Sequence, residues 1–204
     1  MTHVQTNRPL PAVRLIAVAV AALAALLMLL QPTSGEAAPM KAKFGADLSQ
    51  PGITAVPAPE PCPLGGSCTR VQNYYAGPPH AGNVPFAPFN GTITKLRLLA
   101  ETPGKLKLQL VKRGQMTDSK VTRNGPTIRY QGTGAVETFK VDVPVKMNEW
   151  LAFKTKQANT LNCDPMNAGE GYVYQPALAP GGPFAPAYAT EPCTALIGAT
   201  VVMN

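Results

Sequence analysis

Short runs that alternate apolar and polar residues constrain this chain more than any other feature of its sequence. In Lys105–Leu110 leucines alternate with Lys105, Lys107 and Gln109, and in Phe139–Val145 apolar residues alternate with Lys140, Asp142 and Pro144. Successive side chains of a β-strand point to opposite faces, so this period of two predicts strands with one buried and one solvated face. Such runs fill residues 89–156 and indicate an antiparallel β-structure.

The same reasoning, together with 22 prolines and 18 glycines that favour turns, predicts eight or nine strands. They are expected at residues 69–75, 94–99, 105–112, 120–123, 127–131, 136–145, 150–155, 172–174 and 195–202. Thr102-Pro103-Gly104 is expected to join the second and third strands into a hairpin, and Asn124-Gly125 to separate the fourth from the fifth. The predicted fold is all-β: a two-sheet antiparallel sandwich resembling a jelly roll.

The N-terminus has the pattern of a secretory signal. Arg8 and Arg14 precede an apolar run from Leu15 to Leu30, which is followed by small and polar residues. This predicts a signal peptide over residues 1–37 that is helical in its apolar part and is cleaved after Ala37. The alternative is an uncleaved helix that anchors a mature domain to the membrane, although 16 residues are fewer than the roughly 20 that span a bilayer.

Two regions are expected after the predicted signal peptide. Residues 38–61 are rich in proline and alanine and indicate an extended arm. Residues 62–204 then form one sandwich domain. Within it, residues 163–193 form an insertion rich in proline and glycine.

All four cysteines lie after the predicted signal peptide, and an even number in an exported chain indicates two disulfides. Three pairings are possible. We favour Cys62–Cys68, which closes a small loop, and Cys163–Cys193, which closes the insertion. Zinc is the alternative, but the spacing does not match a zinc knuckle.

Residues 86–97 are similar to an "aPfdGvIt" opening motif, and residues 138–145 to a "tf.trlPv" strand motif. In these segments the chain resembles a group of secreted bacterial β-sandwich proteins of unassigned function. Residues 68–72 and 198–201 match its first and closing strands, so the resemblance covers about Cys68 to Val202. It implies a β-sandwich and no particular activity. The chain departs from the group at Met147-Asn148-Glu149, where a Gly-Asp turn is missing.

The sequence does not predict an enzyme, a metal site or a cofactor. His80 is the only histidine after the signal peptide, and no Gly-x-Ser-x-Gly motif is present. The acidic residues are scattered, which leaves paired-carboxylate chemistry as a weak alternative.

Charge and aromatic residues supply the candidate binding residues. Residues 95–156 contain 13 basic and 5 acidic residues. Lys95, Arg97, Lys105 and Lys107 are predicted on outward strand faces, as are Lys140, Lys154 and Lys156. If these strands share a sheet, they would form a basic plate that attracts anionic polymers; the alternative is that the lysines only keep the sheet soluble. Nucleic acid is not expected, because aromatic residues do not alternate with these cations.

Exposed aromatic rings are the second candidate. Trp150, Tyr172, Tyr174 and Tyr188 are predicted to bind a sugar by stacking, the alternative being that they cover the end of the core. The sequence therefore favours a secreted, non-catalytic binding module for a glycan or an anionic cell-envelope polymer. A structural or adhesive surface protein that acts through protein contacts is the alternative function, and the oligomeric state is not predicted.

Overall fold

In a computed structural model, residues 38–48, 56–57, 62–73, 84–156, 161–164, 170–191 and 193–204 are described. The predicted signal peptide and His80 lie outside these residues. Pro39–Asn204 form one compact unit, and it is all-β and built from antiparallel sheets. No helix long and apolar enough for a membrane span occurs in these described ranges.

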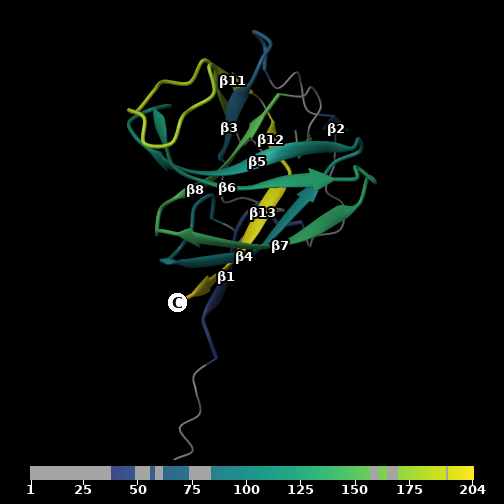
Figure 1. The fold of residues 1–204 in the computed structure, drawn as a ribbon, viewed down its shortest axis with the longest axis vertical. Coiled ribbons are helices and arrows are strands. Elements are labelled where there is room, and N and C mark those ends of the chain that lie inside the picture. The colour runs from purple at the N-terminus through teal and green to yellow at the C-terminus, as the bar shows by residue number, and fades with distance from the viewer. Residues whose placement is uncertain are drawn as a thin grey trace, which may run out of the picture. The chain divides into compact units, whose positions relative to one another are not determined.

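Two large sheets make the sandwich (Figure 1). The four-stranded sheet has the order β1 (Lys41–Gly45), β13 (Ile197–Met203), β4 (Gly91–Leu99), β7 (Val136–Val145). The six-stranded sheet has the order β11 (Ala189–Glu191), β10 (Glu170–Tyr174), β3 (Cys68–Asn73), β8 (Trp150–Thr155), β5 (Gly104–Arg113), β6 (Ser119–Tyr130). A small third sheet joins β12 (Thr194–Ala195), β9 (Asn162–Asp164) and β2 (Val56–Pro57).

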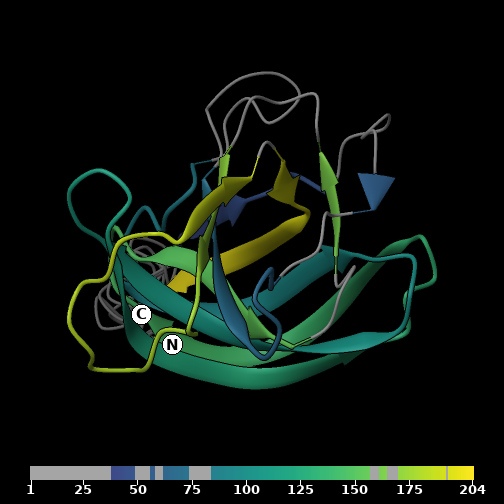
Figure 2. The same ribbon diagram turned by 90° about the horizontal axis from the view of Figure 1, so that it is seen from above.

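The core lies between the two large sheets, which Figure 2 shows as curved layers. Leu106, Leu108 and Leu110 of β5 are fully buried and belong to the same apolar cluster as Ile93 and Leu96 of β4. The lysines between the leucines face outward. The alternation in the sequence therefore predicts correctly which side of each strand is buried, and each buried leucine contributes roughly 1.5–3 kcal/mol of transfer free energy.

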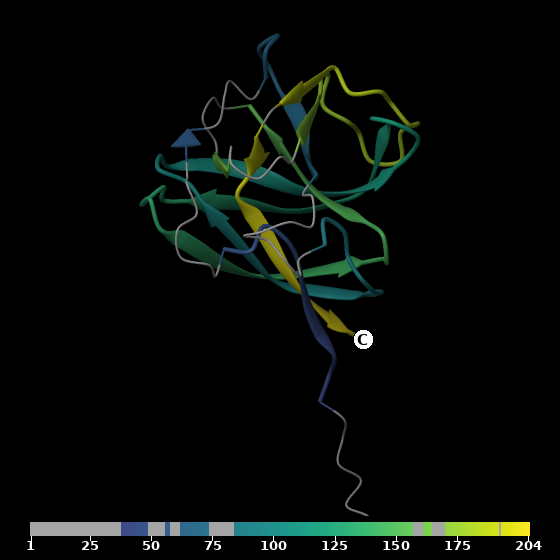
Figure 3. The same ribbon diagram turned by 180° about the vertical axis from the view of Figure 1, so that it is seen from behind.

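The segment expected as an extended arm instead supplies the first strand of the sandwich. Lys41–Gly45 pairs with β13 over its whole length, and Figure 3 shows the two strands side by side. Phe44 is fully buried in the core. The sandwich therefore begins before Cys62, because a short strand at the edge of a sheet needs only one buried side chain and one partner to be held in place.

The hairpin predicted at Thr102-Pro103-Gly104 is wrong. β4 and β5 belong to different sheets, so this connection crosses from one layer to the other. A Cβ atom at Gly104 would lie 2.3 Å from the hydroxyl oxygen of Tyr130, which excludes a side chain there. The true hairpin is formed by β5 and β6.

Asn124-Gly125 is also not a turn, since β6 continues through both residues. The register of β5 and β6 shifts here, and the Nε2 of Gln109 donates to the Oδ1 of Asn124 at 2.9 Å. Gly125 leaves room for Leu108, whose side chain would lie 3.0 Å from an added Cβ. The pair thus forms an irregularity within a long strand.

The turn before β8 is built without the glycine found in the resembling group. Asn148 takes the left-handed conformation with φ of 66°, which asparagine tolerates better than most residues. Glu149 is buried and accepts the backbone N–H of Lys146 at 2.8 Å. Asn90 accepts the N–H of Met147, also at 2.8 Å, and ties the turn to the start of β4.

Both expected disulfides are present. Cys62 pairs with Cys68 and Cys163 with Cys193. The second bond joins β9 to the residue just before β12, so it closes the insertion as predicted.

Candidate functional site

The outer face of the six-stranded sheet is divided into a covered half and an open half. Over β10, β3 and the adjoining ends of β8, β5 and β6, the outward residues are apolar, among them Val71, Val111 and Val121. The loop between β10 and β11, residues 175–188, covers this half and is called the cover loop below (Figure 2). It is fixed to β6 by backbone bonds between Ala185 and Ser119.

A stacked cation lies at the edge of the covered half. The guanidinium carbon of Arg113 is 4.1 Å from the ring centroid of Tyr172 and 5.2 Å from that of Trp150. Its Nη2 donates to the carbonyl of Met116 at 2.7 Å. Trp150 also contacts Phe86, with 5.6 Å between ring centroids. These rings already have partners from within the protein.

Tyr174 is buried beneath the cover loop. Its hydroxyl donates to the carbonyl of Thr117 and shares a 2.7 Å hydrogen bond with the hydroxyl of Ser119. Burial raises the pKa of the Tyr174 phenol above its ordinary value, and the hydrogen bond with Ser119 opposes that rise. Tyr174 and Tyr172 share one strand face, as expected from their spacing, but the face is not open.

Of the four aromatic residues predicted to bind sugar, only Tyr188 is well exposed, at 51%. Tyr172 and Tyr174 are buried and Trp150 is half-buried. The structure therefore does not bring the four rings together on an open surface. The sequence could not show this, because the loop that covers this face is held there by contacts with Thr69 of β3 and Ser119 of β6, which are distant in the chain.

A buried polar row marks the boundary between the two halves. The Oγ1 of Thr69 lies 2.9 Å from the Oε1 of Gln109 and accepts the N–H of Leu178 at 3.0 Å. Gln109 in turn bonds Asn124. These contacts hold the cover loop in place and leave the sheet beyond the row uncovered.

The open half is a groove of about 360 Å³, called the basic groove below. Strands β5, β6 and β8 and the residue after β8 line it. Its cations are Lys105, Lys107, Arg129, Lys154 and Lys156. No acidic residue lines it among the described residues.

Like charges lie directly opposite each other in this groove. Lys107 of β5 is the register partner of Lys154 of β8, and Lys105 of β5 is the partner of Arg129 of β6. Directly opposed residues have Cβ atoms about 4.5–5.5 Å apart, and like charges at that distance destabilise a sheet. The repulsion within these two pairs therefore lowers the stability of the folded protein, and a bound anion would reduce that repulsion.

The other predicted cations lie elsewhere. Lys95, Arg97 and Lys140 belong to β4 and β7, so they are on the four-stranded sheet and do not share the basic groove. Arg97 donates from Nη2 to the carbonyl of Leu48 at 2.8 Å. The basic residues therefore do not form one flat plate, because the chain crosses from the four-stranded sheet to the six-stranded sheet between β4 and β5.

Arg129 is the groove residue that the sequence reasoning missed. The run Thr127-Ile128-Arg129-Tyr130 alternates with Ile128 and Tyr130 buried, so the period of two could have placed Arg129 on the outer face. Because Asn124-Gly125 was expected to be a turn, Arg129 was not assigned to the long strand that pairs with β5.

A buried ion pair was not predicted either. Arg70 of β3 pairs with Glu191 of β11, and their side chains are 1% and 10% exposed. Burial lowers the pKa of Arg70 to about 10, so the guanidinium is still charged at neutral pH. The pair joins the edge strand β11 to the middle of the sheet and lies far from solvent, which indicates a structural role.

No group of three or more potential metal ligands occurs in the part of the chain that the structure describes. No protein-family model matches the sequence, and a search of curated proteins finds no match.

Proposed function

We propose that the protein is a secreted, non-catalytic β-sandwich module of the jelly-roll type that binds a linear anionic polymer of the cell envelope. The ligand lies in the basic groove. No chemical step is part of this proposal.

One observation carries it: among the residues that the structure describes, five cations and no acidic residue line the basic groove, with two like-charged pairs in direct register. Lysines that serve only solubility are usually mixed with acidic residues on the same face. An anionic ligand neutralises both pairs and releases counterions, so binding gains affinity from the repulsion within the free protein.

The groove favours an anionic polymer over a neutral glycan. A neutral sugar is commonly held by open aromatic rings, and three of the four candidate rings are half-buried or buried. The residues lining the groove include no aromatic side chain, which also argues against single-stranded nucleic acid.

The strand order supports the jelly-roll assignment. Eight strands are divided between the two sheets in the orders β1-β13-β4-β7 and β3-β8-β5-β6, and the chain changes sheet at each step between them except from β5 to β6. The two disulfides are compatible with an extracellular protein. The signal-like N-terminus supports secretion.

The test is binding of two labelled polymers, poly(glycerol phosphate) and polygalacturonate, to protein purified after expression of the full chain. Affinity is measured by fluorescence anisotropy at about 50 mM and about 500 mM NaCl. We expect Lys107→Gln/Lys154→Gln to lower the low-salt affinity roughly tenfold or more. The polymer that binds more tightly identifies the anionic group.

The matched control is Lys41→Gln/Lys43→Gln, which removes the same charge from two exposed residues of β1, at the far edge of the four-stranded sheet from β7. It should change the affinity by less than about twofold. Equal losses in the two double variants, or no binding of either polymer, would overturn the proposal.

A further inference from the structure

The basic groove is not the only hollow that β6 lines. β6 and β7 are the end strands of their sheets, and a hollow of about 720 Å³ lies between Arg123–Pro126 of β6 and Lys140–Pro144 of β7. A further hollow of about 380 Å³ is lined by the β5–β6 hairpin and the turn at residues 146–149. Arg123 lines both hollows, so they adjoin.

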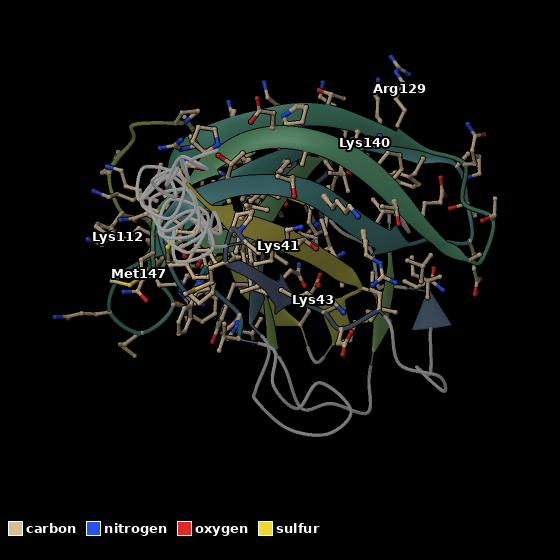
Figure 4. All side chains as sticks on the ribbon, turned by 90° about the horizontal axis from the view of Figure 1, so that it is seen from below. Lys41, Lys43, Lys112, Arg129, Lys140 and Met147 are labelled. Carbon is tan, nitrogen blue, oxygen red and sulfur yellow. A yellow bond between two sulfur atoms is a disulfide. The ribbon has the colours of Figure 1, made fainter. Side chains whose placement is uncertain are left out.

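Successive residues of β6 border the basic groove and both hollows: the groove lies on the outer face of the six-stranded sheet, and the hollows lie at the edge of the sandwich, beside β7 and the turn at residues 146–149. Lys120, Thr122 and Arg123 line the last hollow, Arg123–Pro126 the middle one, and Thr127 and Arg129 the basic groove. In Figure 4, Lys112 and Met147 lie toward one end of this side of the molecule, and Lys140 and Arg129 toward the other. Nine residue steps of a strand extend about 30 Å.

The added hollows carry the same sign of charge as the groove. Their cations are Lys112, Lys120, Arg123, Lys140 and Lys146. Their acidic residues are Asp142 and Glu149. Glu149 is only 4% exposed, and its carboxylate accepts the N–H of Lys146. Among the described residues that line the two hollows, Asp142 is therefore the acidic residue that is exposed to solvent.

The two sheet edges that border the middle hollow are not suited to an added peptide strand. Pro126 and Pro144 lie on the facing strands and lack a backbone N–H. Strand addition depends on main-chain hydrogen bonds along the edge, which each proline interrupts. A ligand on this side of the sandwich would therefore bind to the charged side chains and not to the backbone of the edge strands.

We infer that the ligand is a linear polyanion of about 30 Å or more that follows β6 from the basic groove to the β5–β6 hairpin. This inference rests on the proposed function and specifies its ligand: a chain with an anionic group on each repeat, bound at many weak contacts. Occupation of successive hollows by one chain makes affinity depend on length, since each added contact is intramolecular.

The experiment measures the affinity of oligogalacturonates with contour lengths of roughly 10, 30 and 60 Å, chosen around the reach of β6. The same series is made with glycerol phosphate oligomers, so that carboxylate and phosphodiester chains are compared. We expect affinity to rise about 10- to 100-fold from the shortest to the middle length, and only about two- to threefold beyond it.

The diagnostic variant is Lys112→Gln/Lys146→Gln. Both residues are exposed and neither lines the basic groove, so the fold and the groove are preserved. It should weaken the 30 Å oligomer about tenfold and change the 10 Å oligomer by less than about twofold. Lys107→Gln/Lys154→Gln should weaken the binding of both lengths, and Lys41→Gln/Lys43→Gln should weaken neither.

The inference that one chain occupies the groove and both hollows would be overturned by either of two results. The first is that the shortest oligomer binds as tightly as the longer ones. The second is that the Lys112→Gln/Lys146→Gln variant binds like the unmodified protein. Either result leaves the basic groove as the site, so the proposed function stands. Failure of every oligomer to bind would overturn both.

Discussion

Lys107 and Lys154 are direct register partners on β5 and β8, and both line the basic groove. Together with the opposed Lys105 and Arg129, they place four cations on three neighbouring strands. A sheet that served only as a scaffold could exchange one member of each pair for a neutral or acidic residue and become more stable. The arrangement is explained if the surface is completed by an anion.

Removal of one charge from this pair should stabilise the free protein. We expect Lys154→Gln to raise the free energy of unfolding by about 0.2–1 kcal/mol at low salt, because the repulsion from Lys107 is lost. The gain should shrink at about 0.5 M NaCl, where screening is strong. Urea denaturation at both salt concentrations measures it.

The control for this prediction is Lys41→Gln, because the register partner of Lys41 is the uncharged Val202. It should change stability little at either salt concentration. A Lys154→Gln variant that is destabilised equally at low and high salt would contradict the repulsion.

The Arg113 stack should contribute to stability and not to polymer binding. Arg113→Met removes the cation from between Trp150 and Tyr172, and we expect a loss of about 1–2 kcal/mol in the free energy of unfolding. Trp150 is the only tryptophan, so its fluorescence reports the change directly. The exposed neighbour Lys112→Met is the control, and should not alter the emission. Unchanged emission in Arg113→Met would show that the stack is not formed in solution.

Alkaline pH should weaken the contribution of Tyr174. Burial raises its pKa in the folded protein, whereas the unfolded phenol ionises near 10. Above that pH the folded state holds more protons than the unfolded state, so stability falls as pH rises. The difference in unfolding free energy between the protein and Tyr174→Phe should therefore be constant below about pH 9 and decrease toward pH 11. A difference that does not change over this range would refute the prediction.

Breaking the buried pair Arg70–Glu191 should lower the free energy of unfolding strongly, whereas replacing both residues by apolar ones should lower it much less. Glu191→Gln leaves a buried guanidinium without its counter-charge, for which we expect a loss of about 3–5 kcal/mol. The double variant Arg70→Met/Glu191→Leu should lose much less than the sum of the losses in Arg70→Met and in Glu191→Leu. Chemical denaturation at pH 7 gives the double-mutant cycle, at a pH where Arg70 is charged. Additive losses would argue that the two side chains do not interact.

The local pattern of the sequence predicts strands well and connections poorly. Val136–Val145 and Trp150–Thr155 form β7 and β8 with the bounds that alternation predicts. Of the three cysteine pairings that the sequence allows, the structure contains the favoured one. A turn signal such as Thr102-Pro103-Gly104, however, reverses the chain equally well within a sheet or between two sheets, and only packing of the leucines of β4 against those of β5 decides between them.

Distant segments decided the candidate site. The sequence by itself determined that Lys105 and Lys107 face away from the core and that Tyr172 and Tyr174 share a strand face. Which cations become neighbours depended on the sheet order, which separates Lys95 from Lys107 and brings Lys154 beside it. Residues 175–188 follow the tyrosines directly in the chain, but they cover them only because the loop folds back onto β3 and β6. A side chain's direction is a property of its own strand, whereas its neighbours are set by strands and loops that meet only when the sandwich closes.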